Sequence, residues 1–153
     1  MATPKVVFKA TGRYDFDRAE PVYEWEAERD EGTFVSHGYW CEIKRHHTLR
    51  SLCGYVLIGK THPYWTLNVD LNVHGGITHS DGIRLGFDCA HAGDLVPDHF
   101  RLGLGYSGRG RHPYRVDDVY RNWAFVTEEL NRLAAQLRAI DTRGDGMTQP
   151  DTA

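Results

Sequence analysis

Residues 119–140 read VYRNWAFVTEELNRLAAQLRAI, and this stretch decides the fold class. Its apolar side chains recur at alternating spacings of four and three residues, which places them on one face of an amphipathic helix. Asp117 precedes the stretch as the expected N-cap, and Glu128 with Arg132 forms a favourable pair four residues apart. The apolar face spans about three heptads, too few for a free coiled coil, so we expect the helix to pack on a sheet.

Two segments upstream of the helix show the period of β-strands. Leu67–Val73 and Ile83–Phe87 each alternate apolar and polar side chains, which predicts strands with one buried and one polar side. The nine residues between them contain two glycine-bearing turn signals, Gly75-Gly76 and Asp81-Gly82, so an antiparallel pair with an elaborated loop is predicted. This pairing would put five polar residues on one sheet face: Asp70, Asn72, His74, Arg84 and Asp88.

Further strands are expected nearer the N-terminus. Thr33–Ile43 is rich in β-formers and is interrupted by Gly38, which predicts two short strands or one bulged strand. The apolar run Cys53–Ile58 predicts a buried strand. The fold class that follows is α+β, with a mostly antiparallel sheet packed against a long C-terminal amphipathic helix. At 153 residues the chain is expected to form a single domain over residues 1–141, with 142–153 as a polar, disordered tail.

Composition excludes several classes of protein. The chain carries 18 basic and 21 acidic side chains, for a net charge of -3, so a generic electrostatic nucleic-acid binder is not expected. No apolar run is long enough to cross a membrane and the first residues lack a signal-peptide pattern, so we expect neither a membrane span nor secretion. Three cysteines without a CxxC pair support neither a disulfide framework nor a cysteine-rich zinc site, which indicates a cytoplasmic protein with reduced thiols.

The densest group of reactive side chains is HGGITHSDGIRLGFDCAHAGD, residues 74–94, with three histidines and three aspartates. Asp88, His91 and Asp94 follow one another at three-residue intervals, so a helical turn would bring their side chains together. His74 ends the preceding predicted strand and would meet Asp88 across the hairpin. The sequence therefore predicts a His/Asp site at this end of the sheet.

Two kinds of chemistry fit this group. An aspartate beside a histidine fixes the imidazole tautomer and raises its basicity, so His74 and His91 are predicted as general base and acid, with Asp88 orienting one of them. Two histidines and two aspartates are also a ligand set for a divalent metal, but no HExxH or DxD pattern is present, and neither metal nor cofactor is predicted. A structural role stays open, in which Asp88 caps a turn, His91 makes a structural hydrogen bond and Asp94 is solvated.

Other side chains are expected to bind a phosphate-containing ligand, because aromatic rings stack on bases while hydroxyl and guanidinium groups steady phosphate charge. The predicted ligand-binding residues are Tyr55, Trp65, Thr78, Arg84, Asp94, Arg109 and Arg111. The last two follow GLGYSG at 103–108, which matches GxGxxG but precedes Arg-Gly-Arg-His-Pro instead of opening a helix. A Rossmann fold is therefore not expected, and the segment is either a phosphate-binding lid or an ordinary surface loop.

Two further features have both a functional and an ordinary interpretation. Residues Arg45–Arg50 read RHHTLR, a cationic patch that is either a solvated face or an anion contact. Cys89 neighbours His91, as a Cys–His nucleophile requires, but the adjacent Asp88 would raise the pKa of the thiol. We therefore interpret Cys89 and Cys53 as small buried hydrophobic residues.

Several phrases of the sequence together resemble a family of small bacteriophage and prophage proteins. The phrases are Cys53-Gly-Tyr-Val56, His62-Pro63, VHGGIT at 73–78, GFDCAHAGD at 86–94, and Tyr114-Arg115 followed by the helix through Gln136. The resemblance covers about residues 38–138, and Ile77 stands where the family usually has leucine. It implies a setting more than a mechanism: a small accessory phage-type protein made in the cytoplasm of a bacterial host.

The resemblance is the basis of the expected function, because accessory phage proteins commonly counter host defence and some act on cyclic nucleotide alarm signals. We expect an anti-defence protein whose partner is a small nucleotide, and a phosphodiesterase-type hydrolase that cleaves a cyclic oligonucleotide. Two alternatives stay open. The same pocket could sequester the nucleotide uncleaved, or the aromatic and charged N-terminal third could inhibit a host defence protein. The sequence does not decide whether the chain forms a homo-oligomer.

Overall fold

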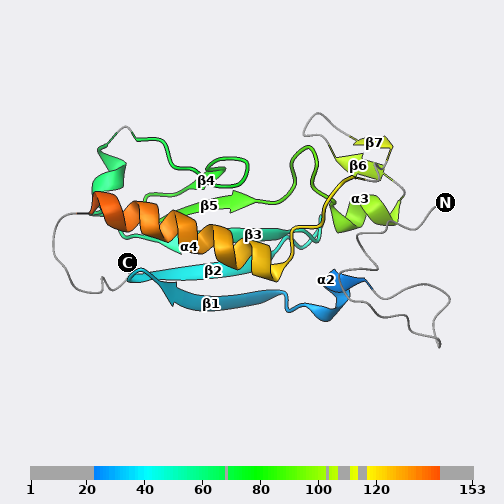
Figure 1. Cartoon of the computed structure of the whole chain (residues 1–153), viewed down its shortest axis with the longest axis horizontal. Helices are drawn as coiled ribbons and strands as arrows, with labels where there is room; N and C mark the ends of the chain where they lie inside the picture. The colour runs from blue at the N-terminus through cyan, green and yellow to red at the C-terminus, as the bar shows by residue number, and fades with distance from the viewer. Residues whose placement is uncertain (1–22, 68, 103, 107–110, 114–116, 142–153) are drawn as a thin grey trace.

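The computed structural model describes residues 23–67, 69–102, 104–106, 111–113 and 117–141, with the backbone alone for 104–106 and 111–113. Five strands form one antiparallel sheet in the order β1-β2-β3-β5-β4 (Figure 1). The strands are β1 (Glu31–Ser36), β2 (Tyr39–Arg45), β3 (Leu52–Leu57), β4 (His79–Ser80) and β5 (Arg84–Asp88). Helix α4 (Trp123–Ile140) packs on one face of this sheet, so the α+β class is confirmed.

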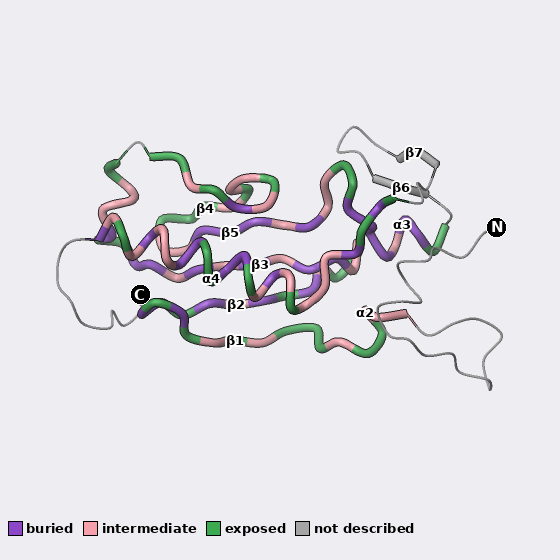
Figure 2. Tube along the Cα trace, viewed as in Figure 1, coloured by how far each residue is buried: buried purple, intermediate pink, exposed green. Residues whose placement is uncertain are grey.

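The main core lies between α4 and the sheet, as the buried segments of both show in Figure 2. One stripe of α4 is buried, and its apolar members are Val126, Leu130, Leu133, Ala134 and Leu137. Gly54 on β3 allows the helix to approach, because a Cβ there would lie 3.1 Å from a methyl group of Leu130. Side chains alternate along a strand, so Cys53 and Tyr55 face the opposite side of the sheet.

The local strand predictions near the N-terminus are confirmed. His37 and Gly38 connect β1 to β2 with φ angles of 51° and 87°, the paired left-handed conformation of a tight hairpin turn. The interruption at Gly38 thus separates two strands. The strand predicted at Cys53–Ile58 is β3, shifted by one residue.

The strand predicted over Leu67–Val73 is wrong. None of its described residues belongs to a strand, and β5 pairs instead with β3 and with the short β4. The segment is held to α4 through Gln136, whose side chain accepts from Asn72 N (2.7 Å) and donates to Asn72 O (2.8 Å). Its alternating pattern reflects Leu71 and Val73 packing on the core while the polar residues stay exposed.

Because the described residues of 67–73 form no strand, the prediction of a single polar sheet face is also wrong. Asp70, Asn72 and His74 lie on the segment along α4, outside the sheet. Only Arg84 and Asp88, four residues apart on β5, share a sheet face.

Helix α4 begins later than predicted. Its N-cap is Asn122, whose side chain accepts from Phe125 N at 2.8 Å, and Asp117 is not the cap. The reason is that Val119 forms a parallel bridge with Asp94, which keeps the residues before Asn122 extended. The ion pair predicted between Arg132 and Glu128 is made with Glu129 instead.

A second, smaller core lies at the end of the sheet where α4 begins. Leu95, Phe100 and Tyr120 are buried there, with Tyr23 and Trp25 packed against them. These two rings of the predicted N-terminal aromatic surface are therefore partly buried against the second core. The remaining described elements are α2 (Glu24–Ala27), η1 (Pro63–Trp65), α3 (Pro97–Arg101), β6 (Leu104–Tyr106) and β7 (Arg111–Pro113).

Two sequence predictions concern residues outside this description. The tail 142–153 lies outside the described residues, and so do residues 103 and 107–110 of the glycine-rich segment. Within the described part of the chain, no helix has the length and apolar character needed to cross a membrane.

Candidate functional site

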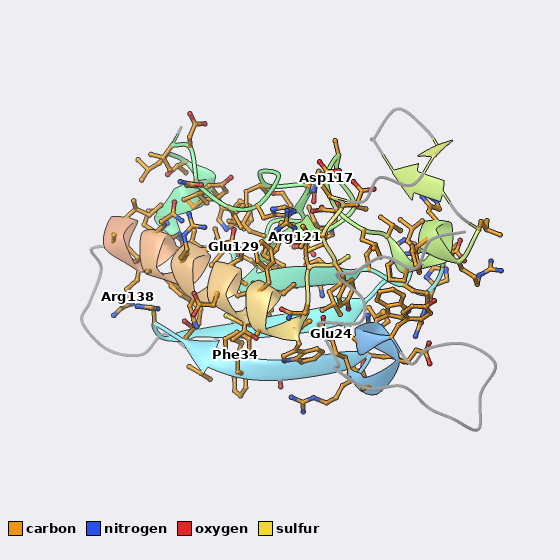
Figure 3. The ribbon with its side chains drawn as sticks, turned by 45° about the vertical axis from the view of Figure 1, so that its right-hand side comes forward. Glu24, Phe34, Asp117, Arg121, Glu129 and Arg138 are labelled. Atoms are coloured by element: carbon orange, nitrogen blue, oxygen red, sulfur yellow. The ribbon has the colours of Figure 1, made fainter. Side chains whose placement is uncertain are left out.

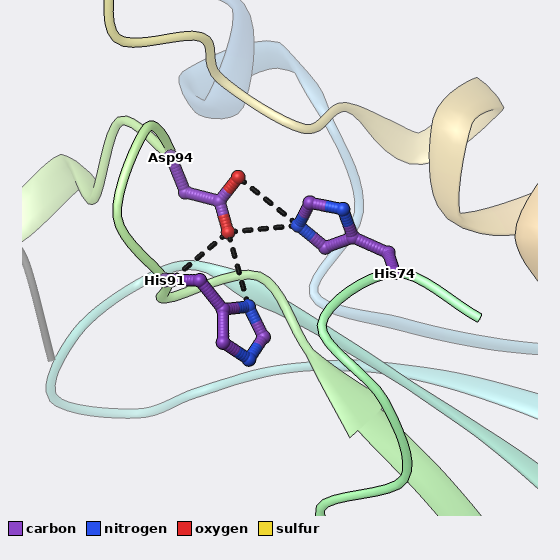
Figure 4. Close-up of side chains that lie close together, drawn as sticks. All are labelled: His74, His91 and Asp94. Carbon is purple, nitrogen blue, oxygen red and sulfur yellow. Dashed lines mark hydrogen bonds and ion pairs between the residues drawn. The ribbon is translucent and has the colours of Figure 1, made fainter. Parts of the chain in front are cut away.

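The candidate site is organised around the carboxylate of Asp94, whose side chain is fully buried. Its Oδ1 accepts from Arg121 Nε at 2.8 Å, and both oxygens accept from His74 Nε2, at 3.0 and 2.9 Å. Its Oδ2 also accepts from the backbone N–H of His91 at 3.0 Å and lies 3.3 Å from His91 Nδ1 (Figure 4). One buried carboxylate thus joins two histidines and an arginine.

Local backbone structure brings these groups together. Asp94 follows Gly93, which has a φ of 92° and closes a turn in which Asp94 N donates to His91 O at 2.9 Å. The bridge between Asp94 and Val119 then aligns the segment that enters α4, and this segment carries Arg121 (Figure 3). The site therefore draws on distant residues, since His74 lies 20 positions before Asp94 and Arg121 lies 27 positions after it.

The protonation of Asp94 follows from its partners. Burial alone would raise the pKa of this carboxyl, but the hydrogen bonds from His74, Arg121 and the His91 backbone hold the pKa below its ordinary value. The carboxylate is therefore ionised at neutral pH. Its charge is matched by the Arg121 guanidinium, so neither imidazole has to be protonated to balance it.

His91 stands between the buried carboxylate and the open side of the sheet. A carboxylate only accepts hydrogen bonds, so the contact with Asp94 puts the proton of a neutral His91 on Nδ1. The other nitrogen, Nε2, is then a proton acceptor, and it lies 3.5 Å from Asp88 Oδ1. This is the arrangement of a general base that a carboxylate orients from behind.

His74 is held on the α4 side of the cluster. Its backbone N–H donates to Oε1 of the buried Glu129 at 2.8 Å, and its ring meets that of Phe125 edge-on at 5.1 Å. The His74 and His91 rings are 5.3 Å apart. The prediction that His74 meets Asp88 across a hairpin is wrong, because its carboxylate partner is Asp94.

A hollow of about 490 Å³ opens on the sheet face opposite α4. Its lining includes Cys53 and Tyr55 from β3, Thr78 just before β4, Asp88 at the end of β5 and His91 shortly after it. We call it the sheet-face hollow. Its volume falls in the range of small-ligand pockets. His91 contributes to the lining and so connects the buried Asp94 cluster to a space that a ligand can enter.

The other predicted ligand-binding residues are distributed differently. Trp65 donates from Nε1 to Gly59 O at 2.7 Å and is not part of the lining. Arg84 pairs with Glu42 and Asp81 and lies 5.6 Å from the centre of the Tyr55 ring, just outside the lining.

The two predicted phosphate-binding arginines cannot be assigned to the hollow. Arg109 lies outside the described residues, and Arg111 is described only by its backbone in β7.

Sequence reasoning missed three residues of this region: Arg121, His46 and His79. Arg121 is remote from Asp94 in the chain, and no local pattern marks it. The two histidines line the sheet-face hollow. The sequence held a signal for both histidines without assigning them a role, because His46 belongs to the cationic patch and His79 to the dense group at residues 74–94.

The cysteines do not act as thiolate nucleophiles here. Burial, with the nearby charge of Asp88, raises the pKa of the Cys53 thiol to about 11. Burial raises the pKa of Cys89 further, with Asp94 adding to the effect. Both thiols are thus protonated at neutral pH, although Cys53 lines the hollow.

The cluster can also be considered as a metal site. Ligand atoms of His74, His91 and Asp94 lie within 4.8 Å of one another. The acceptor positions of Asp94 are already filled by Arg121, by both imidazoles and by a backbone amide. A cation would have to displace the guanidinium from beside its own ligand, so the donor set fits an acid–base cluster better than a metal centre.

Comparisons with models of protein families, with curated proteins and with solved structures find no match.

Proposed function

We propose that this chain is a phosphodiesterase-type hydrolase that cleaves a nucleotide in the sheet-face hollow, with His91 as its general base. One observation carries the proposal: His91 has the buried Asp94 carboxylate on one ring nitrogen and the hollow on its other side. A histidine with a purely structural role needs neither a fixed tautomer nor access to a cavity.

Each neighbour of His91 has a role in this chemistry. Asp94 keeps the proton on Nδ1 so that Nε2 is free to accept one, and Arg121 keeps Asp94 ionised. Asp88 Oδ1 lies 3.5 Å from Nε2, so a carboxylate faces the nitrogen that takes up the proton. His74 shares the Asp94 carboxylate and fixes it in place.

The lining of the hollow supports a nucleotide as the substrate. The Tyr55 ring supplies a surface on which a base can stack, and the Thr78 side chain supplies a hydroxyl donor. The resemblance to phage and prophage proteins then narrows the class. We propose a cyclic oligonucleotide defence signal as the substrate and the cytoplasm of a bacterial host as the setting.

The test is a panel of cyclic di- and trinucleotides incubated with the protein in EDTA and analysed by chromatography. We expect a cleaved product, and a loss of about 10²–10⁴-fold in rate in His91→Asn, the usual contribution of a general base. His37→Asn is the matched control, because His37 is an exposed imidazole in the β1–β2 turn that is not part of the hollow lining.

The same experiment separates the alternatives. Nucleotide that disappears from solution and returns intact after heat denaturation would identify a sequestering protein instead of an enzyme. If no nucleotide in the panel is altered or retained, the proposal fails, and inhibition of a host protein becomes the leading function.

A further inference from the structure

General base catalysis at His91 leaves open which group protonates the departing oxygen. The sequence analysis predicted His74 as the base and His91 as the acid, but His74 is not available as the partner of His91, because its Nε2 is bonded to Asp94 and its ring packs on Phe125, outside the hollow lining. Two other imidazoles line the hollow, those of His46 and His79. Their hydrogen bonds distinguish them.

His46 is fixed as a hydrogen-bond donor that cannot transfer a proton. Its Nδ1 accepts from the backbone N–H groups of Thr48 (3.2 Å) and Leu49 (3.0 Å), so Nδ1 carries no hydrogen. The one ring proton is then on Nε2, and giving it up would leave an imidazolate. His46 can donate a hydrogen bond to a phosphoryl oxygen, but it cannot act as the general acid.

His79 has the environment that a general acid needs. Its Nε2 lies 3.4 Å from Asp81 Oδ2, so the ring is oriented by a carboxylate that accepts a hydrogen bond from it. Asp81 is itself held in place, because its Oδ1 accepts from the backbone N–H groups of Ile83 (3.0 Å) and Arg84 (2.7 Å). The His79 ring also meets the Tyr55 ring edge-on at 5.3 Å, beside the proposed base-stacking surface.

We propose that His79, paired with Asp81, is the general acid of this site, and that the nucleophile is the substrate's own ribose 2′-hydroxyl. This inference rests on the proposed phosphodiesterase function. The hollow thus contains two imidazoles, each with its own carboxylate: His91 with Asp94 and His79 with Asp81.

The identity of the nucleophile is inferred from the other side chains that line the hollow. The Cys53 thiol is protonated at neutral pH, and no described base contacts the hydroxyl of Thr78. A hydroxyl next to the scissile phosphate reacts intramolecularly, and well-oriented groups of this kind reach effective molarities of about 10⁵–10⁸ M. An imidazole base and an imidazole acid are sufficient for such a reaction.

The step balances without a further reactant. His91 Nε2 takes the 2′-hydroxyl proton as the 2′-oxygen–phosphorus bond forms. The bond from phosphorus to the 5′-oxygen breaks with its electron pair, and His79 gives that oxygen a proton. The products are a 2′,3′-cyclic phosphate end and a 5′-hydroxyl end, and proton exchange with water restores both histidines. The substrate class is therefore a 3′–5′-linked ribo-oligonucleotide.

The nucleophile is tested with the 3′–5′-linked cyclic dinucleotides of the panel and their 2′-deoxy counterparts. We expect wild-type protein to release a 2′,3′-cyclic phosphate end from the ribose compounds and to leave the 2′-deoxy compounds intact. Equal cleavage of both, or incorporation of ¹⁸O from labelled water into the first product, would overturn the inference and leave the proposed phosphodiesterase standing.

The general acid is tested with a leaving group that needs no proton. In His79→Asn, we expect cleavage of the natural substrate to fall about 10²–10⁴-fold, and cleavage of an analogue with sulfur as the 5′-bridging atom to stay near the wild-type rate. His91→Asn should lose both activities, and His37→Asn neither. Equal losses on both substrates in His79→Asn would overturn the assignment, and no wild-type cleavage would refute the proposed function itself.

The role of the Asp81 carboxylate is tested with the variant Asp81→Asn. The asparagine keeps a side-chain oxygen that can accept from the backbone N–H groups of Ile83 and Arg84. Asp81 and Tyr55 face His79 directly, and Arg84 with its partner Glu42 lies next to them. Because Asp81 acts through His79, Asp81→Asn should reduce cleavage of the natural substrate more than cleavage of the 5′-sulfur analogue. Equal losses on the two substrates would contradict a role for Asp81 in positioning the acid.

Discussion

Gly75 and Gly76 are adjacent and both have positive φ, 68° and 81°, but only Gly75 touches the candidate site. A Cβ on Gly75 would lie 2.2 Å from His91 Cε1, whereas a Cβ on Gly76 would have no neighbour within 4 Å. The close packing of the VHGGIT segment against His91 therefore requires glycine at the first position for space, and at both positions for backbone conformation.

The pair provides a matched test at the scale of single residues. Gly76→Ala should cost about 1–2 kcal/mol of unfolding free energy, the penalty of a left-handed alanine. Gly75→Ala should cost about 1–3 kcal/mol more from overpacking, and should reduce turnover about 10²-fold by moving His91. Urea unfolding and initial rates measure both, and equal activity in the two variants would contradict the assignment of His91.

Asp94 is the residue on which the ionic balance of the site depends. Asp94→Asn should cost about 3–5 kcal/mol at pH 7, because it leaves Arg121 without its carboxylate. The folded pKa of Asp94 is lowered, so its stabilisation is complete above the unfolded value of about 4 and disappears as pH falls through the folded value. The difference in unfolding free energy from wild type should therefore shrink below about pH 4. A difference that is constant from pH 7 to pH 3 would contradict this account.

At the scale of elements, α4 does more than cover the sheet. Glu129 accepts from the backbone N–H of His74 at 2.8 Å, and Gln136 makes two hydrogen bonds to the backbone of Asn72 (Figure 3 labels Glu129). These contacts replace the strand pairing that residues 69–78 lack. The helix therefore positions His74 for its contact with Asp94.

This role of α4 can be measured. Glu129→Leu removes the acceptor and should cost about 1–3 kcal/mol of unfolding free energy, with faster hydrogen exchange at the His74 amide. Glu128→Leu is the control on the exposed side of the same helix turn and should change stability by less than about 0.5 kcal/mol. Unchanged exchange at His74 in Glu129→Leu would show that the segment is held by other contacts.

The elements also show what a sequence can predict here. The β1–β2 hairpin and the apolar stripe of α4 depend on residues close together in the chain, so local patterns were sufficient. The alternation in Leu67–Val73 failed because a segment that packs on a helix with alternate side chains has the same period as a strand. Asp88, His91 and Asp94 were found as a group, but the central place of Asp94 depends on Arg121, a contact that only the tertiary fold creates.

At the scale of the whole molecule, Arg45 ties distant parts of the chain together. Its fully buried guanidinium donates to Asp30, Glu28 and Tyr120, and to the carbonyl oxygens of Arg29 and Arg50. The contact with Arg50 holds the turn after β2, which carries His46 into the sheet-face hollow.

We expect Arg45→Met to cost about 3–5 kcal/mol of unfolding free energy, because Glu28 then stays buried without its charged partner. Lys44→Met, at the exposed neighbouring position, should cost less than about 1 kcal/mol, since Lys44 only makes a surface pair with Glu42 at 3.8 Å. Thermal and urea unfolding compare the two variants. Equal effects would mean that the Arg45 interactions do not stabilise the fold beyond an ordinary surface charge.

The contact between Arg121 and Asp94 also bears on how the protein is made. A ribosome releases the chain from its N-terminus, so β1 to β5 and Asp94 emerge well before Arg121 does. Until then the Asp94 carboxylate lacks its guanidinium partner, and α4 is not yet present to close the core. The Asp94 cluster can therefore form only after Arg121 and α4 have emerged, so a nascent chain shorter than this lacks the candidate site.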